Sequence, residues 1–399
     1  MTLRFLTAGE SHGPGLVGIV EGLPAGLAVR REAVDADLAR RQIGVGRSAR
    51  MEIEHDQVEI LSGVVAGMTI GSPVALTIKN LDYANWQGKK IAKQTVPRPG
   101  HADLAGGLKY GLDDLRLVGE RASARETAMR VACGALARLL LAEFAVEVGS
   151  HVLEIGGVAA DVPDLPYPEL VGRARASDLA VADPASAERI AARIKEAMAA
   201  GDTTPAPLDY RGRGDTVGGV IEVVAWNVPV GLGSHVHWDR RLDGRLAQAV
   251  MSIQSVKGVE IGPAFANARL PGSQVQDEVL PGSGPGQTTR ASNRAGGLEG
   301  GITNGMPVVV RAALKPIATT PQPLRSVDLA TGEPTRSRYQ RSDYCHVPRA
   351  CVVAEAMVAW VLAEALVEKL GGDSLAEMRA RFEAIECPRD LNNPRTRGL

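Results

Sequence analysis

The stretch VPRACVVAEAMVAWVLAEALVEKLGG, residues 347–372, contains the longest apolar run of the chain and decides how the rest must pack. Pro348 suits the first turn of a helix, and Gly371 suits its end. Glu355 and Glu364 interrupt the run, which is too short and too charged to span a bilayer. We therefore expect a helix that begins near Pro348, ends near Gly371 and lies buried in the core.

The segments on either side of this helix carry polar signals. QRSDYCHVPR, residues 340–349, precedes it and places Arg341 and Asp343 on the loop that enters a buried helix. Asp343 is a candidate site residue, although for this loop alone we favour an Asx turn that only satisfies loop backbone. Beyond the helix, Ser374 and Glu377 form a capping box for a last helix.

Composition limits the function classes. The chain has 399 residues, of which 45% are apolar and 23% charged, and its formal net charge is -1. This balance argues against a general nucleic-acid or membrane binder, so any basic site must be local. The four cysteines form no C-x-x-C pair, which favours a reducing compartment and no zinc site. The amino terminus lacks the pattern of a signal peptide, and we expect a cytoplasmic protein.

The stretch GESHG, residues 9–13, follows a short apolar run, Leu3 to Leu6, that is typical of a strand. Glycines allow close approach of backbone to a ligand, and His12 would stand at the end of a strand, where loops carry chemistry. Imidazole exchanges protons near neutral pH. Taken alone, the stretch is also compatible with a tight turn that carries a solvated histidine.

Arginines cluster after an expected surface helix, residues 32–41. The loop that follows contains Arg47 and Arg50 and comes directly after Arg41. Residues 44–49, GVGRSA, match one form of the dinucleotide fingerprint, but they follow a helix rather than a strand and lack the βαβ context. We favour a local site for an anion.

A second basic segment begins a helix. Ser123 and Glu126 form a capping box, and Arg121 and Arg125 flank it. A helix dipole prefers carboxylates at this end, so two arginines there indicate an anion site, with phosphate as the natural ligand. Surface arginines paired with Glu120 and Glu126 are the alternative.

Residues 82–114 show no helical or strand period, and we expect a long functional loop that carries RPGHAD, residues 98–103, with His101. His235 and His237 suggest a metal pair, but two histidines without a third ligand are more often incidental, and we predict no metal. Alternating runs at 16–20, 52–79, 217–225 and 307–314 predict strands. No linker divides the chain, so we expect one α+β domain, residues 1–399, with a surface insertion near 203–213.

Collected together, these residues describe a cationic site for a small polyanion, with histidine and aspartate available for proton transfer. The motifs also resemble the chorismate synthase family along most of the chain. The resemblance rests on GESHG at 9–13, RRQIGVGR at 40–47, RPGHAD at 98–103, ERASARETAMRVA at 120–132, NRAGGLEGGITNG at 293–305, KPIAT at 315–319 and QRSD at 340–343.

The resemblance implies a β-α-β sandwich of antiparallel sheets and helices, assembled as a homotetramer. It implies the anti-1,4-elimination of phosphate from 5-enolpyruvylshikimate 3-phosphate to give chorismate, a step of the shikimate pathway and of aromatic amino acid biosynthesis. It also implies reduced FMN (FMNH2) as cofactor without net redox change, and it leaves open whether NADPH supplies the reducing equivalents. The duplicated GDT, at 201–203 and 214–216, departs from the usual turn of the family.

The resemblance also implies roles by position. His12 would protonate the departing phosphate, His101 would act as an acid near the flavin ring, and Asp343 would help flavin N5 accept the substrate proton. The substrate-binding residues would be Arg41, Arg47, Arg50, Arg125 and Arg341. The cofactor-binding residues would be Arg121, Ala122, Ser123, Gln254, Ser255, Gly300, Lys315, Pro316, Ile317, Ala318, Thr319 and Arg341.

Two other function classes compete with this hypothesis. A flavin-dependent oxidoreductase could bind a nicotinamide through residues 44–49, but the strand and the ribose-binding acid of such a site are missing. An RNA-binding module could use the arginine loops. The aromatic content of 4% and the balanced charge oppose it, because base stacking needs aromatic platforms.

Overall fold

The computed structural model describes residues 2–45, 55–199, 214–282, 288–337 and 343–386. Four features expected from the sequence lie outside these ranges: Arg47, Arg50, Arg341 and the surface insertion near 203–213.

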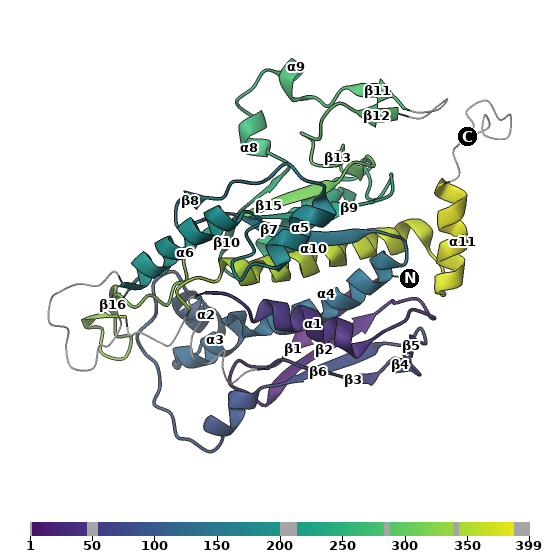
Figure 1. The fold of residues 1–399 in the computed structure, drawn as a ribbon. Helices are drawn as coiled ribbons and strands as arrows, with labels where there is room; N and C mark the ends of the chain where they lie inside the picture. The colour runs from purple at the N-terminus through teal and green to yellow at the C-terminus, as the bar shows by residue number, and fades with distance from the viewer. Residues whose placement is uncertain (1, 46–54, 200–213, 283–287, 338–342, 387–399) are drawn as a thin grey trace.

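Two antiparallel sheets form the outer layers (Figure 1). One has four strands in the order β1 (Arg4–Ala8), β2 (Gly15–Glu21), β6 (Val74–Lys79) and β3 (Val58–Ser62). The other has five in the order β10 (Val256–Ile261), β15 (Val308–Leu314), β9 (Gly219–Trp226), β7 (Glu147–Ile155) and β8 (Val158–Ala159). Each strand alternates side chains between its two faces, so one face of each sheet turns inward.

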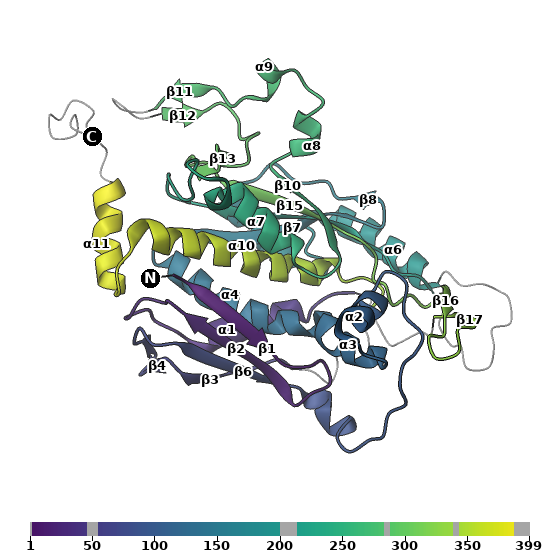
Figure 2. The same ribbon diagram turned by 180° about the vertical axis from the view of Figure 1, so that it is seen from behind.

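Helices fill the space between the sheets. They are α1 (Arg31–Arg41), α4 (Thr127–Ala142), α7 (Leu242–Met251) and α10 (Val347–Leu370). In Figure 1, α10 lies nearer the five-stranded sheet and α4 nearer the four-stranded sheet, and Figure 2 shows α7 beside α10 from behind. The expected α+β architecture, a β-α-β sandwich, is confirmed.

Helix α10 matches the expected buried helix closely. It begins at Val347 and ends at Leu370, with Gly371 as its C-cap. The expectation that this run is too short and too charged to span a bilayer was wrong, because by length and composition α10 could cross a membrane. Even so, 94% of its most apolar 18 residues are buried inside the protein. A helix that is apolar on all sides needs cover on all sides, and the two sheets with α1, α4 and α7 provide it.

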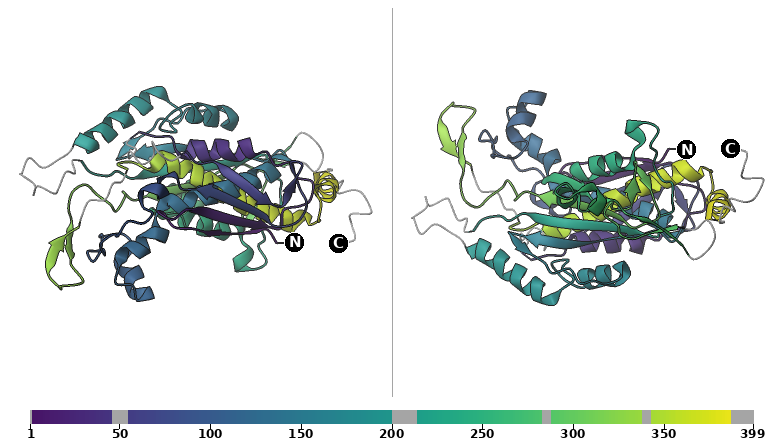
Figure 3. Two further views of the ribbon diagram at one scale, coloured as in Figure 1. Left: turned by 90° about the horizontal axis from the view of Figure 1, so that it is seen from below. Right: turned by 90° about the horizontal axis from the view of Figure 1, so that it is seen from above.

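Shorter elements surround this core. The helical ones are η2 (Leu81–Asn85), α2 (Asp103–Tyr110), α3 (Leu115–Ala122), η3 (Ala124–Glu126), α5 (Tyr167–Arg175), α6 (Pro184–Ala199), η4 (Trp238–Arg240), α8 (Ala264–Asn267), α9 (Gly272–Val275) and α11 (Leu375–Glu386). The hairpins are β4–β5 (Val64–Val65, Met68–Thr69), β11–β12 (Val279–Pro281, Thr288–Arg290), β13–β14 (Leu298–Glu299, Ile302–Thr303) and β16–β17 (Arg325–Val327, Pro334–Arg336). Views from below and above show α2, α3 and β16–β17 at one end of the sandwich (Figure 3).

The expectation of a structureless loop over residues 82–114 was wrong. This segment contains η2 and α2, and α2 ends at Gly111 in a left-handed conformation with φ of 64°. Two glycines within α2 weakened the helical signal. They are needed because a Cβ on Gly106 would lie 2.4 Å from Val118 Cγ1 of α3.

The capping box at Ser123 was only half right. Ser123 Oγ accepts a hydrogen bond from Arg125 N at 3.2 Å, but it caps the short η3 turn, which leads into α4. The Glu126 carboxylate does not return to Ser123. It accepts hydrogen bonds from Gln254 and Arg130, at 2.7 and 3.1 Å. Arg121 lies in the last turn of α3, where a cation suits the helix dipole.

One buried charge cluster ties α10 to its neighbours. Glu355 accepts hydrogen bonds from Arg40 at 2.7 and 2.8 Å and from Ser150 at 2.7 Å. Burial alone would raise the pKa of Glu355, but the charges of Arg40, Arg138 and Arg175 hold this pKa below its ordinary value. The polar group that interrupts the apolar run is therefore fully compensated inside the core.

Helices α4 and α10 cross at Gly134. A Cβ on Gly134 would lie 2.4 Å from the Ala356 Cβ of α10, so we expect Gly134→Ala to lower the free energy of unfolding by about 1–3 kcal/mol. The matched control is Gly172→Ala in α5, where nothing lies within 4 Å of the added Cβ; it should gain up to about 1 kcal/mol from helix propensity. Urea unfolding measures both, and equal effects would contradict the close crossing.

His151 of β7 makes stability depend on pH. Its side chain is buried, and neither ring nitrogen has a hydrogen-bond partner among the described residues. Burial lowers the pKa of His151, while nearby Glu222 opposes this effect only in part. Since the unfolded chain takes up this proton near pH 6.5 and the folded chain resists it, stability is lost as pH falls from 7 to 5.

We therefore expect His151→Leu to lose less unfolding free energy between pH 7 and pH 5 than the parent chain. Urea unfolding of both proteins at the two pH values checks this expectation. An unchanged slope in His151→Leu would show that His151 is not a source of the acid sensitivity.

Candidate functional site

The turn that carries His12 lies at the end of the sandwich where α3 meets β1. His12 N donates a hydrogen bond to Glu120 Oε2 at 2.8 Å, and His12 Nδ1 lies 3.0 Å from Glu120 Oε1. Burial would raise the pKa of Glu120, but its hydrogen bonds with His12 lower this pKa. The carboxylate is therefore ionised and accepts a hydrogen bond from the protonated Nδ1 of His12. The imidazole also packs on Trp86, with ring centroids 4.1 Å apart.

Asn80 holds this turn in shape and joins it to the arginines. Its side-chain amide donates hydrogen bonds to the carbonyl oxygens of Glu10 and Gly13, at 3.0 and 2.8 Å. Its Oδ1 accepts a hydrogen bond from Arg125 Nε at 2.8 Å. A single buried amide therefore fixes the His12 turn relative to Arg125.

Arg125 and Arg41 share one buried carboxylate. Arg125 Nη1 donates to Asp56 Oδ1 at 2.6 Å, and Arg41 Nη1 lies 3.5 Å from Asp56 Oδ2. Arg41 also donates to Thr127 Oγ1 and to the carbonyl oxygen of Ala124, at 3.0 and 2.8 Å. Burial lowers the pKa of Arg41 to about 10, and the nearby guanidinium of Arg125 adds to this effect, while Asp56 opposes it.

His101 and its partners form a third group of residues at the same end of the sandwich, after the group around His12 and the group of Arg41 and Arg125. Its Nδ1 lies 2.6 Å from Asp103 Oδ1, and Asp103 also accepts hydrogen bonds from Arg98. Burial would raise the pKa of Asp103, but Arg98 and His101 hold it well below its usual range. The ionised carboxylate orients the ring of His101, whose Nδ1 also lies 3.1 Å from Arg98 Nη2.

The segment 315–319 packs against this third group. Arg98 Nη1 donates to Thr319 Oγ1 at 3.1 Å, and Lys315 Nζ donates to the carbonyl oxygen of Gly100 at 2.8 Å. Burial lowers the pKa of Lys315. The carbonyl oxygen of Ile317 accepts a hydrogen bond from Thr216 Oγ1 at 3.0 Å, which fixes the segment from its other side.

Residues 254 and 255 adjoin the same segment. Lys315 N donates to the carbonyl oxygen of Ser255 at 2.9 Å, and Ser255 has a φ of 72°, which side-chain-bearing residues rarely adopt. Gln254 Nε2 is bound to Glu126, whereas Gln254 Oε1 is buried without a hydrogen-bond partner in the part of the chain that the structure describes.

Asp343 enters from the loop before α10. It forms an ion pair with Arg349 Nη1 of the first helical turn. His346 lies beside this pair, and burial lowers its pKa to about 4, so its imidazole is neutral at physiological pH. The charges of Asp343 and Arg349 act on Arg41, so this ion pair lies near the pair formed by Arg41 and Arg125.

The other predicted cofactor residues lie farther from the segment 315–319 or make fewer contacts with the three groups. Arg121 donates to Thr7 and to the carbonyl oxygen of Gly9, at 2.8 and 3.2 Å, so it braces the His12 turn from outside. Ala122 ends α3, and Ser123 Oγ lies 3.2 Å from Ser11 Oγ. Gly300 lies in the β13–β14 hairpin, where a Cβ would approach the Cβ of His235 at 3.7 Å. No contact described here joins Gly300 to the three groups.

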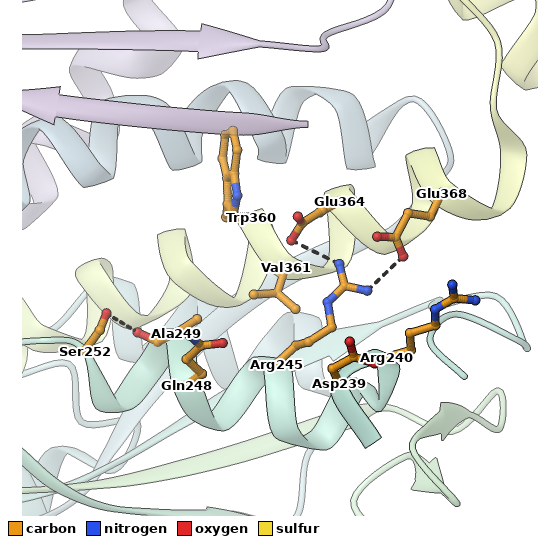
Figure 4. A pocket seen from close by; sticks show the side chains of 10 residues that line it. All are labelled: Asp239, Arg240, Arg245, Gln248, Ala249, Ser252, Trp360, Val361, Glu364 and Glu368. Atoms are coloured by element: carbon orange, nitrogen blue, oxygen red, sulfur yellow. Dashed lines mark hydrogen bonds and ion pairs between the residues drawn. The ribbon is translucent and has the colours of Figure 1, made fainter. Parts of the chain in front are cut away.

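A separate cleft of about 490 Å³ lies between α7 and α10. Figure 4 shows Arg245 reaching across it to Glu364 and Glu368 of α10. None of the predicted site residues lines this cleft. The groups around His12, Arg41 with Arg125, and His101 lie elsewhere, at the end of the sandwich where α4 and α10 begin.

Several residues that build the site were missed. Asp56, Asn80, Trp86 and Asp103 orient the predicted arginines and histidines, and Arg349 holds Asp343. The sequence offered a signal for Asp103, because this residue follows His101 by two positions in RPGHAD and could have been predicted as its partner. Asp56 and Asn80 had none, because their partners lie 69 and 45 residues away in sequence.

Comparisons with known proteins identify the family of the chain. The family model described as chorismate synthase matches residues 3–367. The chorismate synthase of Geobacter sulfurreducens is 53% identical over 396 residues, which cover 96% of this chain and 98% of that protein. That of Saccharopolyspora erythraea is 50% identical over 397 residues, with 96% of each chain covered.

A solved structure titled "Crystal Structure of Chorismate Synthase" shows the same fold. It is 44% identical in sequence, has a TM-score of 0.76 and is aligned over 96% of this chain and 97% of its own. The resemblance first suggested by the motifs is confirmed by these matches over nearly the whole length. The chain therefore belongs to the chorismate synthase family, a family of lyases of the shikimate pathway.

Proposed function

We propose that the protein converts 5-enolpyruvylshikimate 3-phosphate to chorismate by anti-1,4-elimination, in which a ring hydrogen and the phosphate leave and a new double bond forms. The observation that carries the proposal is the link through Asn80, which joins the His12 turn to Arg125. A proton donor is thereby fixed beside buried guanidinium groups. A departing phosphate needs both, a proton and cations that stabilise its charge.

His12 is the proposed acid for the phosphate. Because ionised Glu120 accepts from Nδ1, proton exchange with a ligand falls to Nε2. The ring plane is set by Glu120 and by packing on Trp86. This arrangement gives His12 one orientation and one reacting nitrogen.

The arginines are proposed to bind the phosphate and two carboxylates of the substrate. Arg41 and Arg125 both lie against the carboxylate of Asp56, and two guanidinium groups beside one carboxylate suit an anionic ligand. Guanidinium groups bind such anions with two parallel hydrogen bonds, which lysine cannot do. We assign the same task to Arg47, Arg50 and Arg341.

Reduced FMN is the proposed cofactor, and it would supply electron density to the breaking C–O bond without net redox change. The residues of the described site fit a flavin. Gln254 Oε1 is a buried acceptor that a flavin N–H would satisfy, and Lys315 offers a partly buried cation. His101 and Asp343 are the proton-handling groups assigned to this side, and we propose the cofactor residues Arg121, Ala122, Ser123, Gln254, Ser255, Gly300, Lys315, Pro316, Ile317, Ala318, Thr319 and Arg341.

A homotetramer of single-domain chains is also proposed. One hydrophobic cluster extends from Leu3 to Met378, which supports a single domain over residues 1–399. The outer face of the four-stranded sheet exposes Leu6, Val17 and Ile19, and Leu6 is 70% exposed at the edge strand β1. An apolar sheet face of this kind suits contact with another copy.

We further propose a cytoplasmic location. Cys133, Cys345 and Cys351 are free and buried, as expected for a protein of a reducing compartment.

Anaerobic turnover with chemically reduced FMN tests the function. We expect equal amounts of chorismate and phosphate, with and without NADPH, and no stoichiometric NADPH consumption, because the elimination has no net redox change. Phosphate release measures the rate. If every turnover required hydride from NADPH, the protein would instead be an oxidoreductase. A comparison of oxidised FMN with and without NADPH shows whether the chain reduces its own flavin.

His12→Ala should retain binding of reduced FMN but lose about 10²- to 10⁴-fold in kcat, the contribution typical of a general acid. His237→Ala serves as control, because His237 is exposed and pairs with Asp239. Stopped-flow measurement of phosphate release checks both variants under anaerobic conditions. Near wild-type kcat in His12→Ala would remove His12 from the mechanism.

A further inference from the structure

The first turn of α10 holds a guanidinium whose hydrogen-bonding capacity is only half used. Arg349 donates through Nη1 to Asp343, while its Nε and Nη2 are buried and have no hydrogen-bond partner among the residues that the structure describes. Leaving such donors unpaired in the interior is costly. A site of this kind is retained most readily where a ligand completes it.

The geometry of the unused donors identifies the ligand chemistry. Nε and Nη2 lie on the same edge of the planar guanidinium, and this edge donates two parallel hydrogen bonds to a carboxylate or phosphate. Gly44, with a φ of +140°, would place a Cβ 3.9 Å from Nε. Glycine therefore brings no side chain against the donor edge.

Among the described residues, more guanidinium groups than carboxylates lie around Arg41. Arg41 lies within the electrostatic reach of Arg125, Arg349, Asp56 and Asp343. Three guanidinium groups against two carboxylates leave one positive charge in excess in this group alone. His346 is neutral through burial and leaves this charge balance unchanged.

We propose that Arg349 is a substrate-binding residue, whose Nε and Nη2 donate to an oxyanion group of the substrate while Nη1 holds Asp343. The proposal rests on the proposed function for the identity of that substrate. It assigns Arg349 a double task, because the same planar group that binds the ligand also positions the carboxylate assigned to proton handling.

The test compares Arg349→Met and Arg349→Lys with Arg245→Met. Arg245 is a matched control, since it is similarly buried and also pairs with acidic residues, Glu364 and Glu368 of α10, outside the candidate site. In anaerobic turnover with saturating reduced FMN, Arg349→Met should raise KM for 5-enolpyruvylshikimate 3-phosphate by about 10- to 100-fold, the effect of a lost charged hydrogen-bond pair. Arg245→Met should leave KM unchanged.

Arg349→Lys keeps the inference testable if Arg349→Met fails to fold. It keeps the charge but cannot donate two parallel hydrogen bonds, so its KM should also rise, although less than that of Arg349→Met. Wild-type KM in Arg349→Lys would overturn the bidentate contact. A weaker Kd for reduced FMN with an unchanged substrate KM would assign the oxyanion to the cofactor and overturn the assignment to the substrate.

Thermal unfolding with inorganic phosphate as the probe separates this inference from the proposed function. Phosphate should raise the Tm of the wild-type protein and of Arg245→Met, and raise that of Arg349→Met clearly less. This result would support the oxyanion edge even if the wild-type protein failed to form chorismate. Equal phosphate-induced shifts in all three proteins would overturn it.

Discussion

Burial of α10 on all sides is the constraint on which the rest of the structure depends. An apolar helix of 24 residues cannot present a polar face to water, so it must be enclosed. Two sheets with one inward face each, separated by helices, achieve this enclosure (Figure 1). The close crossing at Gly134 and Ala356 and the compensated charge of Glu355 are consequences of the same enclosure.

The enclosure also determines where chemistry can occur. Helices α4 and α10 both begin at the end of the sandwich where β1 delivers the His12 turn, and α1 ends there with Arg41. Segments that are distant in sequence therefore place charged groups around one region. The rigid core fixes these groups more firmly than the surrounding loops alone could, which suits a site that must hold several anionic groups at once.

Much of this arrangement could be predicted from the sequence, because periodicity reports on elements and motifs report on local chemistry. The bounds of α10 and the strands β1, β2, β9 and β15 follow from such patterns. The prediction for the region that contains α2 was wrong, because this helix is stabilised by close packing of its glycines on α3 rather than by an apolar stripe. Asp56 and Asn80 were not predictable, since their value depends on pairing with Arg125 across the fold.

Hydrogen-bond satisfaction separates the structural charges from those that are suited to a ligand. Glu355 is as deeply buried as any site residue, yet Arg40 and Ser150 satisfy both of its oxygens. One turn or more toward the start of α10, Arg349 and His346 keep buried nitrogens without partners within the described ranges. His151 also keeps buried ring nitrogens without hydrogen-bond partners within the described ranges, but it lies in β7 of the five-stranded sheet, with Glu222 Oε1 3.5 Å from its Nε2. Since a fold that satisfies Glu355 so completely has the means to satisfy Arg349, the unpaired edge is better explained by a ligand than by poor packing.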